Sequence, residues 1–175
     1  IVALVIIFLA VIGVLGVSAS GPIMAATAAP ALAIAFWRNA LGAVIMGVPT
    51  AVRNPGGFTR LSRAETKWTL IASLALALHF ACFITSLKLT SVAAATALVC
   101  LQAGWIAIFN LFRGIHVAPR VLAGLGAALA GVVVITGFDL TLSREAALGD
   151  LLAVAGGALA GLYTIAGGKA RATMS

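Results

Sequence analysis

The side chains that could carry out chemistry are few, and the acidic ones stay apart. The 175-residue chain has four acidic residues, Glu65, Asp139, Glu145 and Asp150, and all of them fall in predicted loops or at predicted helix ends. Acid–base catalysis and metal binding need carboxylates, histidines or cysteines that are held together. The sequence has no such cluster, no nucleophile triad and no phosphate-binding glycine loop. We therefore expect no catalytic residue, no metal, no cofactor and no enzymatic activity.

Arg38 is a charged residue inside an apolar run that begins at Ala31. At 1.5 Å per residue, it lies roughly 10 Å into a helix that starts there. A charge at bilayer depth costs about 2.5–3.5 kcal/mol on insertion scales. Arg38 therefore either extends to the outer headgroups or faces a cavity, where it would attract an anionic group or hold two helices together. Both interpretations remain open.

His79 lies near the middle of the apolar run that begins at Trp68. A single histidine on an apolar face is most often a hydrogen-bonded packing residue. His79 is also the one imidazole at mid-depth, which makes it the candidate for proton coupling.

Gln102 and Trp105 are three residues apart, so on a helix they lie near one face. An amide can bind a solute or another helix, and an indole offers a flat wall with one N–H donor. Ser18 and Ser20 flank Gly21-Pro22, a helix break of the kind that either bends a helix or lines a transport site. The predicted solute-binding residues are Ser18, Ser20, Arg38, His79, Gln102 and Trp105.

The composition places these residues in a membrane. Hydrophobic residues make up 63% of the chain and charged residues 9%, whereas soluble domains carry about 25% charged residues. The mean hydropathy is +1.20. The net charge of +7 does not indicate nucleic acid, because the basic residues lie in short gaps between apolar runs and not on one solvated face. We expect lipid, and no nucleic acid, as a partner.

Six apolar runs reach or approach the roughly 20 residues that a transmembrane helix needs. They are Ile1–Ala28, Ala31–Val52, Trp68–Leu87, Val92–Phe112, Val121–Phe138 and Leu148–Gly167. The predicted fold is all-α, a polytopic membrane bundle of about six transmembrane helices. The first run also resembles a signal peptide, but we favour a kinked spanning helix that continues through Pro22.

The basic residues predict an orientation. Eight of them fall in gaps on one side of the predicted membrane: Arg53, Arg60, Arg63, Lys67, Arg113, Arg120, Lys169 and Arg171. Lys88 and Arg144 fall on the other side, with Asp139, Glu145 and Asp150. Since basic loops mark the cytoplasm, we expect a multi-pass protein of the plasma membrane with a cytoplasmic N-terminus.

Small residues recur at four-residue spacing, which makes flat stripes where helices can approach closely. The pairs are Gly157 and Gly161, Ala127 and Gly131, and Gly124 and Ala128. We interpret them as packing faces, and Cys82 and Cys100 as packing residues.

Several of these patterns together resemble a known family. They are the small polar stretch from Ser18 to Pro22, Pro30 followed by Phe36-Trp37-Arg38, the hairpin from Phe83 to Ala95, the glycine-rich run from Gly124 to Gly137, and Gly149-Asp150-Leu151-Leu152. The chain is similar to the EamA-type transporters of the drug/metabolite transporter superfamily. It departs from them at Gln102-Ala103-Gly104, where the family has a proline, and at Gly114-Ile115-His116, where it has a Gly-Glu pair.

The resemblance implies a fold of two inverted repeats with ten helices in all. Residues 1–140 would be the first five-helix repeat and residues 141–175 the start of the second. Because the chain begins with Ile1 and ends at Ser175, we expect a piece of a longer protein. The implied function is export of small organic metabolites, amino acids or drugs by alternating access. The alternatives are a membrane scaffold or enzyme subunit, and a half-size transporter that acts as a homodimer.

Overall fold

The structure, a computed structural model, describes residues 2–54, 61–139 and 143–173, and these residues form helices and short connections without a strand. The helices are α1 (Val2–Ala26), α2 (Ala31–Arg53), α3 (Arg63–Leu89), α4 (Val92–Cys100), α5 (Gln102–Phe112), α6 (Pro119–Asp139) and α7 (Arg144–Thr173). Within the described residues, α1, α2, α3, the α4–α5 pair and α7 are each long and apolar enough to cross a membrane, and α6 is apolar over Pro119–Val134. The predicted all-α membrane bundle is confirmed.

Two helices begin earlier than their apolar runs predict. The hydroxyl of Ser62 accepts from the Glu65 N–H, and the Glu65 carboxylate accepts from the Ser62 N–H, which is a capping box. This box starts α3 at Arg63, before Trp68. In the same way, the Ser143 hydroxyl accepts from the Ala146 N–H at 3.1 Å and starts α7 at Arg144, before Leu148. Polar capping residues, and not the edge of the apolar run, therefore set these helix ends.

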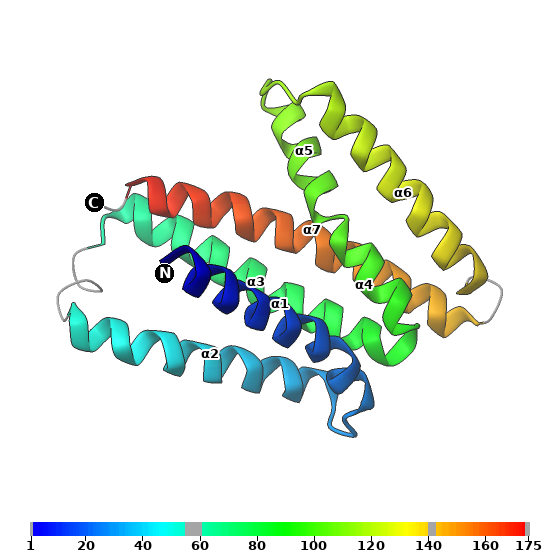
Figure 1. Ribbon diagram of the computed structural model, residues 1–175, viewed down its shortest axis with the longest axis horizontal. Coiled ribbons are helices and arrows are strands. Elements are labelled where there is room, and N and C mark those ends of the chain that lie inside the picture. Colours follow the sequence, from blue (N-terminus) through cyan, green and yellow to red (C-terminus); the bar gives the residue numbers. More distant parts are fainter. Residues whose placement is uncertain (1, 55–60, 140–142, 174–175) are drawn as a thin grey trace.

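The fourth apolar run is two helices, because the chain leaves the regular α-helix at Leu101. There φ is −65° and ψ is 0°, and the Leu101 N–H donates to the Leu98 carbonyl in a tighter, three-residue bond of 3.2 Å. The helical pattern resumes when the Trp105 N–H donates to the Leu101 carbonyl at 3.1 Å. In Figure 1 the chain turns away from α4 at this point, and α5 and α6 lean out of the bundle. The break forms without a proline.

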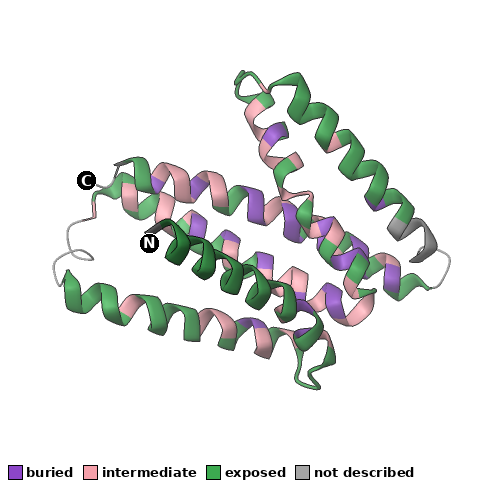
Figure 2. Cartoon of the chain, viewed as in Figure 1, coloured by how far each residue is buried: buried purple, intermediate pink, exposed green. Residues whose placement is uncertain are grey.

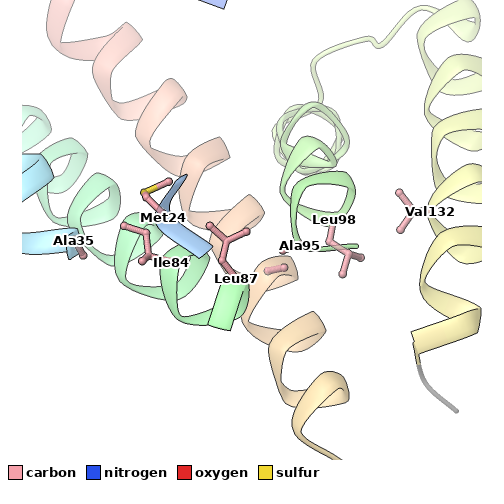
Figure 3. Packing of buried hydrophobic residues seen from close by; sticks show 8 residues of the cluster. Met24, Ala35, Ile84, Leu87, Ala95, Leu98 and Val132 are labelled. Carbon is pink, nitrogen blue, oxygen red and sulfur yellow. The ribbon is translucent and has the colours of Figure 1, made fainter. Parts of the chain in front are cut away.

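The best-packed part of the bundle is formed by α3, α4 and α7. A methyl group on Gly157 would lie 3.2 and 3.3 Å from the carbonyl oxygens of Leu98 and Val99, and one on Gly156 would lie 3.6 Å from the His79 carbonyl oxygen. Such close approach is how helices pack when lipid removes the hydrophobic drive. The buried cluster in Figure 3 lies around this contact and comprises Met24, Ala35, Ile84, Leu87, Ala95, Leu98, Val132 and Ala153.

Large apolar side chains cover the outer faces of the bundle. Phe8 and Leu15 of α1 and Val44 and Met46 of α2 are each more than half exposed, and Figure 2 shows α1 exposed along most of its length. A continuous apolar surface of this extent needs lipid or protein around it. The chain is a multi-pass membrane protein.

The start of α1, the end of α2, the start of α3 and the end of α7 lie at one end of the bundle (Figure 1). Basic residues gather there, and the Lys169 ammonium lies 4.0 Å from the ring centroid of Trp68. Arg60 lies outside the described residues, as does the predicted repeat boundary at 140. Most of the charged residues predicted between or after the spans lie in helices instead: Arg53, Arg63, Glu65, Lys67, Lys88, Arg120, Asp139, Arg144, Glu145, Lys169 and Arg171.

Candidate functional site

Arg38 lies in the angle between α1, α2 and α3. Its Nη1 is 3.7 Å from the thioether sulfur of Met24 on α1, and its Cζ is 4.5 Å from the ring centroid of Phe80 on α3. The side chain is partly buried. A thioether is a weak acceptor, and a ring face attracts a cation without neutralising it. Arg38 is thus held by two weak interactions.

His79 is buried beside Arg38 and is anchored to α7. Its Nδ1 lies 2.9 Å from the carbonyl oxygen of Gly156, and since a carbonyl can only accept, Nδ1 carries the proton in this bond. The His79 ring is 4.8 Å from that of Phe80 and stacks on Phe83 at 6.0 Å. Phe80 therefore contacts both polar residues. We call Met24, Arg38, His79 and Phe80 the Arg38–His79 cluster.

Gln102 and Trp105 both face α7, at the start of α5. Gln102 Nε2 donates to the Thr164 hydroxyl at 3.1 Å, and that hydroxyl donates to the Ala160 carbonyl at 2.9 Å. A methyl group on Gly161 would lie 3.2 Å from Trp105 Cβ. The side-chain amide of Gln102 is thus engaged in a bond between helices, while Trp105 packs on the glycine surface of α7.

Trp105 also lines an apolar cavity of about 510 Å³ under the α5–α6 hairpin. Its other walls include Leu98, Leu125, Leu129 and Val154. The volume is within the range of small-molecule sites. Because aliphatic side chains make up most of the wall, this cavity fits apolar parts of a molecule.

Ser18 and Ser20 lie apart from the other predicted site residues. Helix α1 runs without interruption through Gly21-Pro22, and the Ser20 hydroxyl donates to the Val17 carbonyl at 2.7 Å. Ser18 is exposed. Gly21 is buried against α4, where a methyl group would lie 3.8 Å from Val92 Cγ1. This stretch therefore packs α1 on α4, and no hydrogen bond within the described residues joins either serine to Arg38 or His79.

Asp150 is a buried carboxylate, which the apolar run Leu148–Gly167 placed at the start of a helix. It lies in the second turn of α7 with 7% of its surface exposed, and its Oδ1 accepts from the Thr90 hydroxyl at 2.8 Å. Its Oδ2 is buried and accepts no hydrogen bond from the described residues. The adjacent Gly149 is the signal that could have revealed this contact, since any side chain there would collide with Thr90.

Lys88 joins two helices at the same end of the bundle. Its ammonium, in the last turn of α3, donates to the carbonyl oxygens of Ala25 (3.1 Å) and Thr27 at the end of α1. A cation is favourable at a helix C-terminus, where carbonyl groups lack partners. Lys88 thus fixes α1 against α3 beside the Arg38–His79 cluster, which includes Met24 of α1.

Four of the six predicted site residues thus form two pairs, Arg38 with His79 and Gln102 with Trp105, and α7 links the pairs. Gly156 binds His79, and Gly161 packs on Trp105. These glycines are five positions apart, which is about 7.5 Å along the helix. Comparisons of the chain with protein-family models, with curated proteins and with solved structures found no match.

Proposed function

We propose that this protein is a transporter of the EamA type that exports small organic solutes across the plasma membrane by alternating access. The observation that carries the proposal is the helix break at Leu101, which lies between α4 and α5 at the wall of the apolar cavity. Discontinuous helices at substrate sites are a recurring feature of secondary transporters, because the broken segment can move and can expose polar groups. Gln102 and Trp105 follow the break directly.

The uneven packing of the bundle supports the same proposal. Helix α7 contacts α3, α4 and the start of α5 through glycines with little free space, whereas the rest of the α5–α6 hairpin faces the bundle with larger aliphatic side chains around a cavity. A rigid unit and a loosely attached one are what rocking between two states requires. In this proposal, the hairpin pivots at Leu101.

The proposed orientation, with the N-terminus in the cytoplasm, rests on the basic residues. Arg53, Arg63, Lys67 and Arg171 lie at the end of the bundle that holds the start of α1. Positively charged loops are retained in the cytoplasm. Labelling of single cysteines placed at Arg63 and Arg144 in intact cells tests this: only the one at Arg144 should react with an impermeant reagent.

Transport is tested with the full-length protein in sealed vesicles. We expect saturable movement of at least one solute from a panel of labelled amino acids, organic acids and lipophilic drugs. Cross-linking α5 to α7 through cysteines at Gln102 and Thr164 should stop it, because the hairpin could no longer pivot, and a reducing agent should restore it. Vesicles without saturable flux for any class would overturn the proposal in favour of a scaffold or enzyme subunit.

A further inference from the structure

Arg38 has hydrogen-bonding capacity that the described part of the chain leaves unused. A guanidinium has five N–H donors, and the structure pairs one nitrogen with the Met24 sulfur and the cationic face with the Phe80 ring. Within residues 2–54, 61–139 and 143–173, Arg38 forms no ion pair and donates to no oxygen atom. A charge inside a membrane protein without such a partner is unfavourable.

The contacts of the guanidinium place it among three helices, and one of them, Met24, lies two residues before the end of α1. Phe80 lies nine residues before the end of α3, about 13 Å along the helix axis. The Arg38 side chain turns toward Phe80 of α3 and Met24 of α1. It is therefore held among helices, and the cost of its charge must be offset there.

Space for a partner exists on both sides of Arg38. One hollow of about 450 Å³ lies where α1 ends and α2 begins, and its walls include Met24, Trp37 and Arg38. Another of about 840 Å³ runs between α2 and α3, with Asn39 and Ser73 among its walls. Asn39 Nδ2 donates to the Ala35 carbonyl and keeps a second N–H. An anion could thus reach the Arg38 guanidinium from either hollow. In the larger hollow, the second N–H of Asn39 is an additional neutral donor.

We propose that Arg38 binds an anionic group, a carboxylate or a phosphate, at this position inside the membrane. Planar guanidinium groups bind these anions through two parallel hydrogen bonds. Phe80 and Met24 hold the guanidinium without neutralising it, so its charge is available. The anion belongs either to a solute or to a lipid headgroup. Binding as such does not depend on transport, but its use in moving an anionic solute rests on the proposed function.

The test uses the full-length protein in nanodiscs of uncharged phosphatidylcholine. The thermal midpoint is measured against concentration of propionate, of inorganic phosphate and of the neutral propionamide, and separately with phosphatidylglycerol added to the lipid. An anion that binds the folded state raises the midpoint. We expect propionate, phosphate or phosphatidylglycerol to raise it, and propionamide to leave it unchanged. Effects of the free anions indicate a solute, and an effect of phosphatidylglycerol alone indicates a lipid.

Variants separate Arg38 from the other basic residues. Arg38→Gln should weaken the apparent anion affinity about tenfold or more, because a charge-assisted pair is lost. Arg38→Lys keeps the charge but loses the planar guanidinium, so its anion affinity should lie between those of the unmodified protein and Arg38→Gln. Arg53→Gln, on an exposed residue at the end of the same helix, should leave the affinity unchanged. The midpoint without anion shows that each variant is folded.

Equal responses of the unmodified protein and Arg38→Gln to every anion would overturn the proposal. So would a propionamide response as large as that of propionate. If anions bind at Arg38 but vesicles show no flux, the site stands and the proposed transport does not. If flux is saturable but anions shift the thermal midpoint of the unmodified protein and of Arg38→Gln equally, the proposed transport stands and this inference fails.

Discussion

Helices α6 and α7 carry the same small-residue pattern and use it differently. In α7, added methyl groups on Gly149, Gly157 and Gly161 would lie within 3.2 Å of neighbouring helices. In α6, methyl groups on Gly124 and Gly131 would meet no described atom within 4 Å. Four-residue spacing of small residues therefore shows that a helix can approach another closely, and not that it does.

Polar contacts explain why α7 is the helix that packs. Asp150 binds Thr90, Gly156 binds His79, and Thr164 binds Gln102. These bonds fix the rotation of α7 so that its glycines face α3, α4 and α5. In the described part of α6, Leu129, Val133 and Val134 are more than half exposed. The predicted packing face is thus confirmed for Gly157 and Gly161, whereas Gly124 and Gly131 face open space.

The largest effect should come from Gly149→Ala. Its methyl group would lie 2.9 Å from Thr90 Cβ and 3.0 Å from the Thr90 backbone nitrogen, which cannot rotate away. We expect the free energy of unfolding to fall by about 1–3 kcal/mol, measured by loss of helix with increasing SDS in mixed micelles. Gly167→Ala in the same helix meets nothing within 4 Å and is the matched control. Equal effects of the two substitutions would show that α7 does not pack on the α3–α4 hairpin as described.

Thr90→Val tests whether the buried carboxylate holds α7 in place. The substitution leaves Asp150 with no hydrogen bond to the described residues, and an unsatisfied buried polar group costs about 1–3 kcal/mol. Unfolding in SDS should show this loss, and the double variant Thr90→Val with Asp150→Leu should recover part of it. Thr50→Val, on an exposed hydroxyl that bonds within its own helix, should change little. If the losses measured for Thr90→Val and for Asp150→Leu alone add up to the loss in the double variant, the two side chains do not interact.

The sequence predicts features that depend on the hydropathy of a whole run better than features that depend on single caps or on contacts between helices. The apolar runs predicted five of the six spans correctly, because hydropathy over 20 residues is a strong constraint. For the run Val121–Phe138 the described residues give a shorter apolar helix, Pro119–Val134. The caps at Ser62 and Ser143 lie outside those runs, so the starts of α3 and α7 were predicted too late. The burial of Asp150 was not predicted, because it depends on the contact with Thr90. The contact of Arg38 with Phe80, next to His79, depends on how α2 packs on α3, which no local spacing encodes. The break at Leu101 likewise has no proline or glycine of its own to mark it.

Gln102→Leu should have a smaller effect than the changes at Gly149 and Thr90. The hydrogen bond to Thr164 joins α5 to α7, and such bonds between membrane helices contribute about 0.6 kcal/mol on average. A double-mutant cycle with Thr164→Val in SDS unfolding isolates this energy. A coupling near zero would mean that Gln102 is available to a solute in the folded protein, which would sharpen its predicted binding role.

The smallest effects should come from Gly124→Ala and Gly131→Ala on α6. With open space around both positions, no overlap opposes the change, and alanine favours the helix over glycine by up to about 1 kcal/mol. We expect unfolding free energies unchanged or slightly raised. A clear loss of stability would mean that the α6 face is covered in the membrane by a helix that the described residues do not include. If that loss grew with protein-to-lipid ratio, the covering helix would come from a second copy, because only an interface between copies depends on concentration.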